Sequence, residues 1–269
     1  MLADRGADLR AIAAALRKSG ATVTSVNTDI GLISVRSTST GFLRTARGLS
    51  GVKPAANDGV VGRSPDAGRV QDRVLKEHQA SPNRSSGHGK TVKRGAKADP
   101  LDASLWDMTM IRVPQAHQVE LGNKKVKVGV MDTGLDGTHP DIAPNFDAKA
   151  SRNFVTDMSD IDGDVCEHPS CVDPVSEDDN GHGTHTAGTM AAALNGIGMS
   201  GIAPDVTLVN VRAGQDSGYF FLSPTVNALT YSGDAGLDVV NMSFYVDRGS
   251  TTARGAPRRT PRSRPPSRT

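Results

Sequence analysis

The segment KVKVGVMD at residues 125–132 decides the fold class of this 269-residue chain. Its valines alternate along the chain, and the run is short enough to form a buried β-strand. Two further strand-like segments follow, VTLVNVRA at 206–213 and DVVNMSF at 238–244, and a helical pattern precedes each of them. Strands that alternate with helices predict a parallel sheet with right-handed crossovers, which is an α/β fold. Ligand sites in such sheets lie beyond the carboxyl ends of the strands, and Asp132 stands at the end of the first strand.

A histidine stands between two glycines at the start of the first helical segment, NGHGTHTAGTMAA at residues 180–192. This helix carries Ala, Thr and Gly where a buried helix normally carries Leu and Ile, so we expect another part of the chain to pack very close to it. Asp132 and His182 would supply two of the three groups of a charge-assisted triad for acyl transfer. The positive end of the helix dipole opposes the protonated imidazole, whereas Asp132 favours it and fixes its tautomer. His182 and His185 could instead be metal ligands, although no third ligand with compelling spacing accompanies them.

The composition divides the chain into four regions. Residues 1–62 predict a small α+β domain, in which an amphipathic helix precedes two strands and a second short helix. Residues 63–99 are polar and basic and predict an exposed linker. Residues 100–247 carry the α/β pattern, and residues 248–269 form an Arg- and Pro-rich tail that we expect to be disordered.

The net charge of +2 has its origin in the tail, which contains seven arginines and no acidic residue. Without the tail, 24 basic residues face 29 acidic ones, so the folded part is acidic and we expect no specific nucleic-acid partner. No apolar run reaches the roughly 18 residues that a membrane span requires. The first residues also lack the features of a signal peptide, so the protein is either cytoplasmic or its true start is missing.

The two cysteines, Cys166 and Cys171, lie in an acidic segment that contains proline. In an exported protein they would most simply close a small disulfide loop. A metal site with His168 and pairing with a cysteine outside this sequence remain as alternatives.

The motifs Asp-Thr-Gly and His-Pro-Asp, followed by His-Gly-Thr-His-Thr-Ala-Gly-Thr, together resemble the subtilisin family of serine peptidases. The segment DVVNMSF is similar to the substrate-binding strand of that family, and SLWDMTMIRVPQAH at residues 104–117 resembles the start of its mature domain. Residues 1–62 are similar to its propeptide, which is a folding chaperone and inhibitor that is later cleaved away. The resemblance covers nearly everything up to Asp247.

The resemblance implies a role for individual residues. Asp132 would be the orienting carboxylate, His182 the general base and His185 the second, non-catalytic histidine, while Ser243 and Phe244 would contact the backbone of a peptide substrate. The family often has a structural calcium site, which here implies ligation by Asp141 and Asn195, with Asp102 as a further ligand. The equally plain alternative is that Asp141 is simply a surface acid and Asn195 simply an asparagine in a turn.

The chain departs from the family pattern after the third strand. It has neither the Gly-Thr-Ser-Met-Ala type motif of the nucleophilic serine nor the motif of the oxyanion-hole asparagine. Ser200 and Ser243 stand at the wrong places to replace that serine, and Tyr245 occupies a position where the family usually has glycine. We interpret the composition after Asp247 as that of an out-of-frame segment, so the second half of the enzyme would be lost.

The sequence therefore predicts a secreted, monomeric, subtilisin-like endopeptidase that acts on proteins or peptides, is inhibited by its own propeptide region and is inactive as this chain. An alternative is a non-catalytic fragment whose first domain binds an intact relative as inhibitor or chaperone. A third hypothesis is a chain that does not fold, because its sheet lacks later strands.

Overall fold

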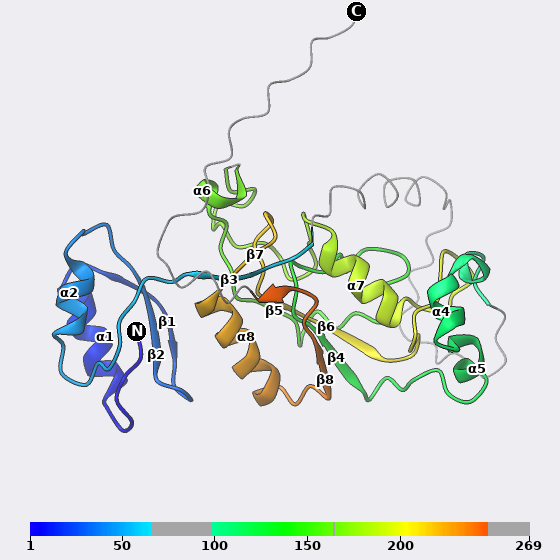
Figure 1. Ribbon diagram of the computed structural model, residues 1–269, viewed down its shortest axis with the longest axis horizontal. Helices are drawn as coiled ribbons and strands as arrows, with labels where there is room; N and C mark the ends of the chain where they lie inside the picture. The colour runs from blue at the N-terminus through cyan, green and yellow to red at the C-terminus, as the bar shows by residue number, and fades with distance from the viewer. Residues whose placement is uncertain (66–97, 164, 247–269) are drawn as a thin grey trace, which may run out of the picture.

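The computed structural model describes residues 1–65, 98–163 and 165–246. Most of the predicted linker and the predicted tail lie outside the described residues. Two compact parts are visible in Figure 1, a small N-terminal unit at one end of the molecule and a larger α/β part beside it. Within the described residues, no helix is both long and apolar enough to cross a membrane.

The N-terminal unit packs two helices on a two-stranded sheet. Its elements are α1 (Leu9–Lys18), β1 (Thr22–Asn27), β2 (Leu32–Arg36) and α2 (Phe42–Arg47), and β1 and β2 are antiparallel. The side chain of Asp8 accepts hydrogen bonds from the amides of Arg10 and Ala11, which caps α1. Ile12, Leu16 and Ile33 are buried in a core of their own. This unit therefore has a separate hydrophobic core.

The larger part is built on a four-stranded parallel sheet in the order β5-β6-β4-β8. The four strands are β4 (Lys127–Val130), β5 (Arg152–Asn153), β6 (Thr207–Arg212) and β8 (Val239–Asn241). The long helices of this part are α7 (His182–Ala191) and α8 (Leu222–Asp234). The predicted α/β class with a parallel sheet is confirmed.

Both faces of the parallel sheet are covered, as is usual where helices connect parallel strands. Leu208 belongs to a core cluster that contains Ala187 and Ala191 of α7. The next residue, Val209, belongs to a second cluster that contains Ala228 of α8. Because successive side chains of a strand point to opposite faces, α7 and α8 lie on opposite sides of the sheet.

A second sheet joins the N-terminal segment to the α/β part. It has three antiparallel strands in the order β7-β3-β9, which are β7 (Tyr219–Phe221), β3 (Val60–Arg63) and β9 (Tyr245–Val246). The middle strand, β3, comes from the end of the N-terminal unit and bridges two strands that follow β6 and β8 in the chain (Figure 1).

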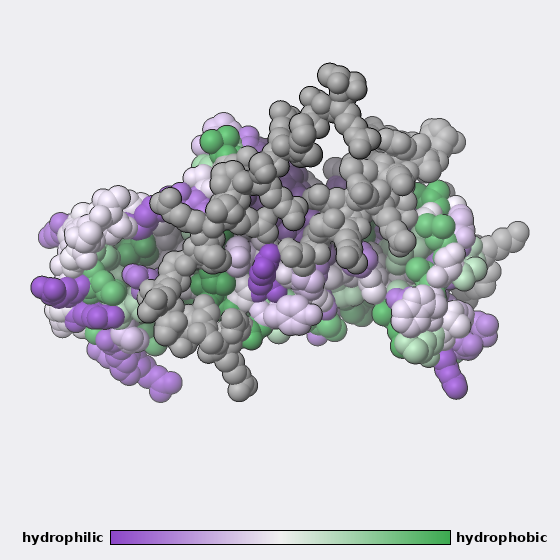
Figure 2. Space-filling view, turned by 45° about the horizontal axis from the view of Figure 1, so that its top comes forward, coloured by the Kyte–Doolittle hydropathy of each residue, from purple (hydrophilic) through white to green (hydrophobic). Residues whose placement is uncertain are grey.

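Short helices complete the α/β part: η1 (Asp102–Ser104), α4 (Trp106–Met110), α5 (Val113–His117) and α6 (Ser159–Asp162). Hydrophobic colour gathers over α4 and α5 at the end of the molecule away from the N-terminal unit (Figure 2). Trp106, Met110, Ile111 and Val119 of this region are exposed.

Candidate active site

Asp132 and His182 meet between β4 and α7. Asp132 comes two residues after the last residue of β4, and it is fully buried. Its Oδ1 atom lies 2.8 Å from Nδ1 of His182, and the same oxygen accepts a hydrogen bond from the amide of Thr133. The hydroxyl of Thr186, one turn further along α7, lies 3.4 Å from Oδ2. The structure thus brings together the two residues that the sequence pairs as carboxylate and imidazole.

The start of α7 is held by Asp178, an acid that no sequence motif singles out. Gly181 precedes the helix with φ of 84°, a conformation that favours glycine. The carboxylate of Asp178 accepts hydrogen bonds from the amide and the hydroxyl of Thr184 and from the hydroxyl of Thr133. Asp178 thereby ties the turn after β4 to the first turn of α7. Its position four residues before His182, close to the start of a helix, is the sequence feature that could have predicted this role.

Gly183 explains the small residues of α7. A Cβ atom at this position would collide with the carbonyl oxygen of Gly134 and would lie 3.0 Å from Cβ of Asp132. The helix therefore passes the turn after β4 at backbone contact, as the sequence predicts. This close approach sets the distance between Asp132 and His182.

The imidazole of His182 has a raised pKa. Its hydrogen bond to Asp132 is the largest cause, and burial opposes it by disfavouring the charged ring. Because the folded state favours the protonated ring, this contact stabilises the fold fully below the ordinary pKa of 6.5, and the stabilisation is lost as the pH rises through the higher folded value.

Asp132→Asn is therefore expected to lower the pKa of His182, because the variant keeps burial and the helix dipole but loses the negative charge. The measurement is an NMR titration of the histidine Cε1 protons in the unchanged chain and in Asp132→Asn. His185 is on the exposed side of α7, and its Cε1 signal serves as the internal reference. An unchanged His182 titration in Asp132→Asn would contradict the assigned contact.

The two residues predicted to contact substrate, Ser243 and Phe244, lie between β8 and β9. Phe244 stacks on Phe220 with ring centroids 4.0 Å apart, and its ring lies against Gly62 of β3. The hydroxyl of Ser243 instead exchanges hydrogen bonds with the side chain of Asn241. Of the two predicted residues, Phe244 is therefore the one whose side chain borders β3.

The residues predicted to hold calcium lie in two neighbouring clusters. Asn195 donates to Oδ1 of the buried Asp141 at 3.2 Å. Asp102 instead accepts hydrogen bonds from the amide and the hydroxyl of Ser200. Asp99, which the sequence analysis did not name, accepts from the amide of Asn195, and burial raises the pKa of its carboxyl group.

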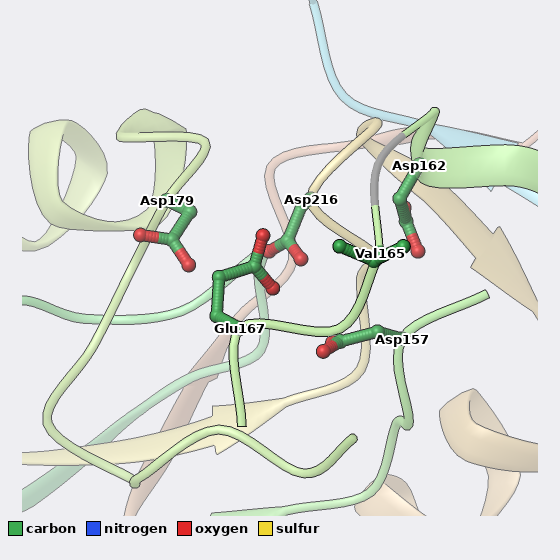
Figure 3. Close-up of a pocket in the computed structure, with 6 residues that line it drawn as sticks. All are labelled: Asp157, Asp162, Val165, Glu167, Asp179 and Asp216. Carbon is green, nitrogen blue, oxygen red and sulfur yellow. The ribbon is translucent and has the colours of Figure 1, made fainter. Parts of the chain in front are cut away.

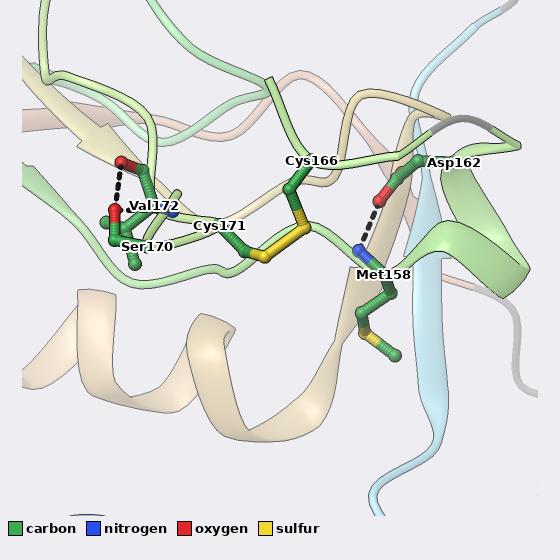
Figure 4. The surroundings of a disulfide bond; sticks show 6 residues. All are labelled: Met158, Asp162, Cys166, Ser170, Cys171 and Val172. Atoms are coloured by element: carbon green, nitrogen blue, oxygen red, sulfur yellow. Dashed lines mark hydrogen bonds between the residues drawn. A yellow bond between two sulfur atoms is a disulfide. The ribbon is translucent and has the colours of Figure 1, made fainter. Parts of the chain in front are cut away.

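Cys166 and Cys171 form a disulfide (Figure 4). Their sulfur atoms are therefore bonded to each other and are not free to bind a metal with His168. The ring of His168 instead pairs with the carboxylate of Glu177 at 2.8 Å.

Comparison with known proteins shows that the chain is similar to peptidases. The subtilase family model matches residues 123–261, a range that extends beyond Asp247. An alkaline protease of Alkalihalobacillus alcalophilus is 34% identical over 162 residues, which cover 60% of this chain and 37% of that protein. Subtilisin Savinase of Lederbergia lenta is 34% identical over 147 residues, which cover 55% of this chain and 47% of that protein. The chain thus spans less than half the length of these relatives.

The fold is also similar to a solved structure. Fervidolysin from Fervidobacterium pennivorans, described as a keratinolytic enzyme related to subtilisin, aligns with a TM-score of 0.52 at 21% sequence identity. The alignment covers 88% of this chain and 34% of fervidolysin. With the family model matching more than half of the chain, the conclusion is that the chain belongs to the subtilase family of serine peptidases.

Proposed function

We propose that this chain supplies the acid and base of a subtilisin-like endopeptidase, with Asp132 as the orienting carboxylate and His182 as the general base. The contact of 2.8 Å between Asp132 Oδ1 and His182 Nδ1 carries this proposal. Because the carboxylate binds Nδ1, the ring's Nε2 remains the atom that takes the proton from an attacking serine hydroxyl and returns it to the leaving amine. The buried carboxylate stabilises the imidazolium that forms in between.

The nucleophile of this reaction is outside the 269 residues, because none of their serines stands in the family's motif. The open edge of the parallel sheet supports this. Among the described residues, β8 has β4 on one side and no strand on the other, and Val239 and Met242 are half exposed there. We propose that further strands, from the part of a complete enzyme that also contains the serine, pack against this edge.

The N-terminal unit is proposed to be an inhibitory propeptide. Its β3 is the middle strand between β7 and β9, with Gly62 paired to both Phe220 and Val246. An extended peptide that adds a strand between two edges makes main-chain hydrogen bonds on both sides, which is how a protease holds a substrate backbone. β3 would thus occupy the groove in which a protein substrate binds.

Contacts with α8 hold the rest of this unit in place. The side chain of Asn27, at the end of β1, donates to Asn227 and Thr230 of α8. Asp58 accepts a hydrogen bond from the amide of Ser223 in the first turn of α8, where a negative charge is favoured. The N-terminal unit therefore supplies the helix with a capping carboxylate from outside its own segment.

This inhibitor role can be tested on subtilisin Savinase with casein as substrate. The purified chain is expected to inhibit Savinase while hydrolysing no casein itself. Asp58→Ala should weaken the inhibition about tenfold, since a lost cap and its charge cost about 1 to 2 kcal/mol. Asp29→Ala, in the exposed turn between β1 and β2, is the matched control and should inhibit like the unchanged chain. Full Savinase activity at a large excess of the chain would contradict the role.

A structural calcium ion fits the cluster around Asp141. The available donors are carboxylate and amide oxygens, which calcium prefers. The loop that carries Asn195 wraps Asp141 closely, because a Cβ atom at Gly198 would collide with its carboxylate. We assign Asp141 and Asn195 to this site. Asp99 and Asp102 are the neighbouring acids: Asp99 accepts hydrogen bonds from the amides of Asn195 and Gly196, and Asp102 accepts them from Ser200. The ion would hold the loop after α7 against the turn after β4.

We propose that the protein is secreted, because Cys166 and Cys171 form a disulfide and such bonds persist in oxidising compartments. Proteins or peptides are the proposed substrates, and the protein is proposed to act as a monomer.

A further inference from the structure

A second cluster of acids lies away from Asp141, on the loop that joins β5 to α7. It surrounds a cavity of about 210 Å³ that is lined by Asp157, Asp162, Val165, Glu167, Asp179 and Asp216 (Figure 3). All but one of these lining residues are acidic. Asp216 comes from the turn between β6 and β7, so the cavity joins two segments that are distant in sequence.

Asp157 is the unusual member of this cluster. Its residue is 9% exposed, and neither of its carboxylate oxygens has a hydrogen-bond partner among the residues that the structure describes. The carboxylate points into the cavity in Figure 3. Burying a carboxylate without a partner is costly, so this geometry indicates that a cationic ligand completes the site.

The spacing of the carboxylates fits one ion. Asp157, Glu167 and Asp216 each place one oxygen so that the three lie within 4.8 Å of one another. Calcium binds oxygens at about 2.3 to 2.6 Å, so two ligands on opposite sides of the ion are about 5 Å apart at most. One ion can therefore contact all three residues.

The described part of the chain provides little positive charge here. Arg212 of β6 is fully buried and forms ion pairs with Asp173 and with Asp216, the latter at 2.5 Å. Neither ion pair includes Asp157 or Glu167. One guanidinium therefore faces several carboxylates, and a divalent cation would balance the excess.

We propose that this cavity is a calcium site in which Asp157, Glu167 and Asp216 are ligands and Asp179 lies close by. The lining residues offer carboxylate oxygens and neither imidazole nor thiolate, which favours a hard cation over zinc. The disulfide closes the loop at Cys166, directly before Glu167, and so holds that ligand near the cavity (Figure 4).

The position of the site gives the ion a structural role. Asn180 stands two residues before His182, and its side chain donates a hydrogen bond to the backbone oxygen of Asp216 at 2.7 Å. The amide of Ser217 also donates to the carboxylate of Asp162. A bound ion would therefore fix the β6–β7 turn against the start of α7, and with it the edge strand β7 beside β3.

Calcium titration of the full chain tests the site. Asp141→Asn serves as the parent protein, because it removes the proposed ligand of the other calcium site. Isothermal titration with calcium chloride is expected to show one site in this parent. Adding Asp157→Asn or Glu167→Gln should weaken its affinity at least tenfold, whereas Asp160→Asn, an exposed acid on α6, should leave it unchanged.

Thermal unfolding separates a lost ligand from a damaged fold. In EDTA, Asp157→Asn should melt at the same temperature as the parent or higher, because it removes repulsion among carboxylates. In excess calcium the parent should gain several degrees and Asp157→Asn should gain little. Glu167 is exposed, so Glu167→Gln tests ligation without disturbing the core. Calcium affinity and calcium-induced melting shifts equal to those of the parent in both variants would overturn the proposal.

Discussion

His182→Ala is expected to lower turnover about a million-fold in a completed enzyme, which is the scale known for the same residue in subtilisin, a relative of this chain. The experiment joins the chain up to Val246 to the C-terminal half of subtilisin E, one of the similar proteins, so that a nucleophilic serine is present. Hydrolysis of a peptide anilide gives kcat and KM. The loss should fall on kcat, because the ring moves a proton in the transition state and does not hold the substrate in the ground state.

Two further variants of this chimera separate the roles of the neighbouring groups. Asp132→Asn should lower kcat about ten-thousand-fold, because the ring keeps its place but loses its correct tautomer and the charge that stabilises it. His185→Ala, three residues along the same helix, is the matched control and should retain near-normal kcat, since that side chain is exposed. An active chimera that tolerates His182→Ala would show that another group acts as the base.

The α/β class and the pair of Asp132 and His182 could be predicted because their signals are local. A short valine-rich strand and a histidine between glycines each define their own element, and the parallel order of strands then brings their ends together. The packing of α7 was also predictable from its small residues. The contact of Gly183 with Gly134 is the physical reason for them.

The acidic cavity could not be predicted from the same sequence. The loop from Asp157 to Asp179 is rich in acids, but an acid-rich loop is usually solvated. Asp157 becomes notable only because it is buried without a hydrogen-bond partner in the described part of the chain, and Asp216 lines the same cavity from a turn elsewhere in the sequence. The position of Asp99 beside Asn195 likewise depends on which side chains the fold brings together.

Gly183→Ala is expected to destabilise the chain by about 3 kcal/mol or more, although alanine is normally the better helix former. The new Cβ atom would meet the carbonyl oxygen of Gly134, which is backbone and cannot rotate away. Gly134 cannot retreat either, because it is packed against the backbone of Glu177 and Asp178 on its other side. The free energy of unfolding from urea denaturation measures the effect.

Gly188→Ala, in the same helix, is the matched control. A Cβ atom there would have no neighbour within 4 Å among the described residues, so this variant should gain up to about 1 kcal/mol from helix propensity alone. The two variants add the same methyl group to the same helix and should move stability in opposite directions. The clash also acts at Cβ of Asp132, so Gly183→Ala should lower the pKa of His182 while Gly188→Ala leaves it unchanged. Equal stability of both variants would mean that α7 does not pass the turn after β4 at backbone contact, and the spacing of Asp132 and His182 would then need another cause.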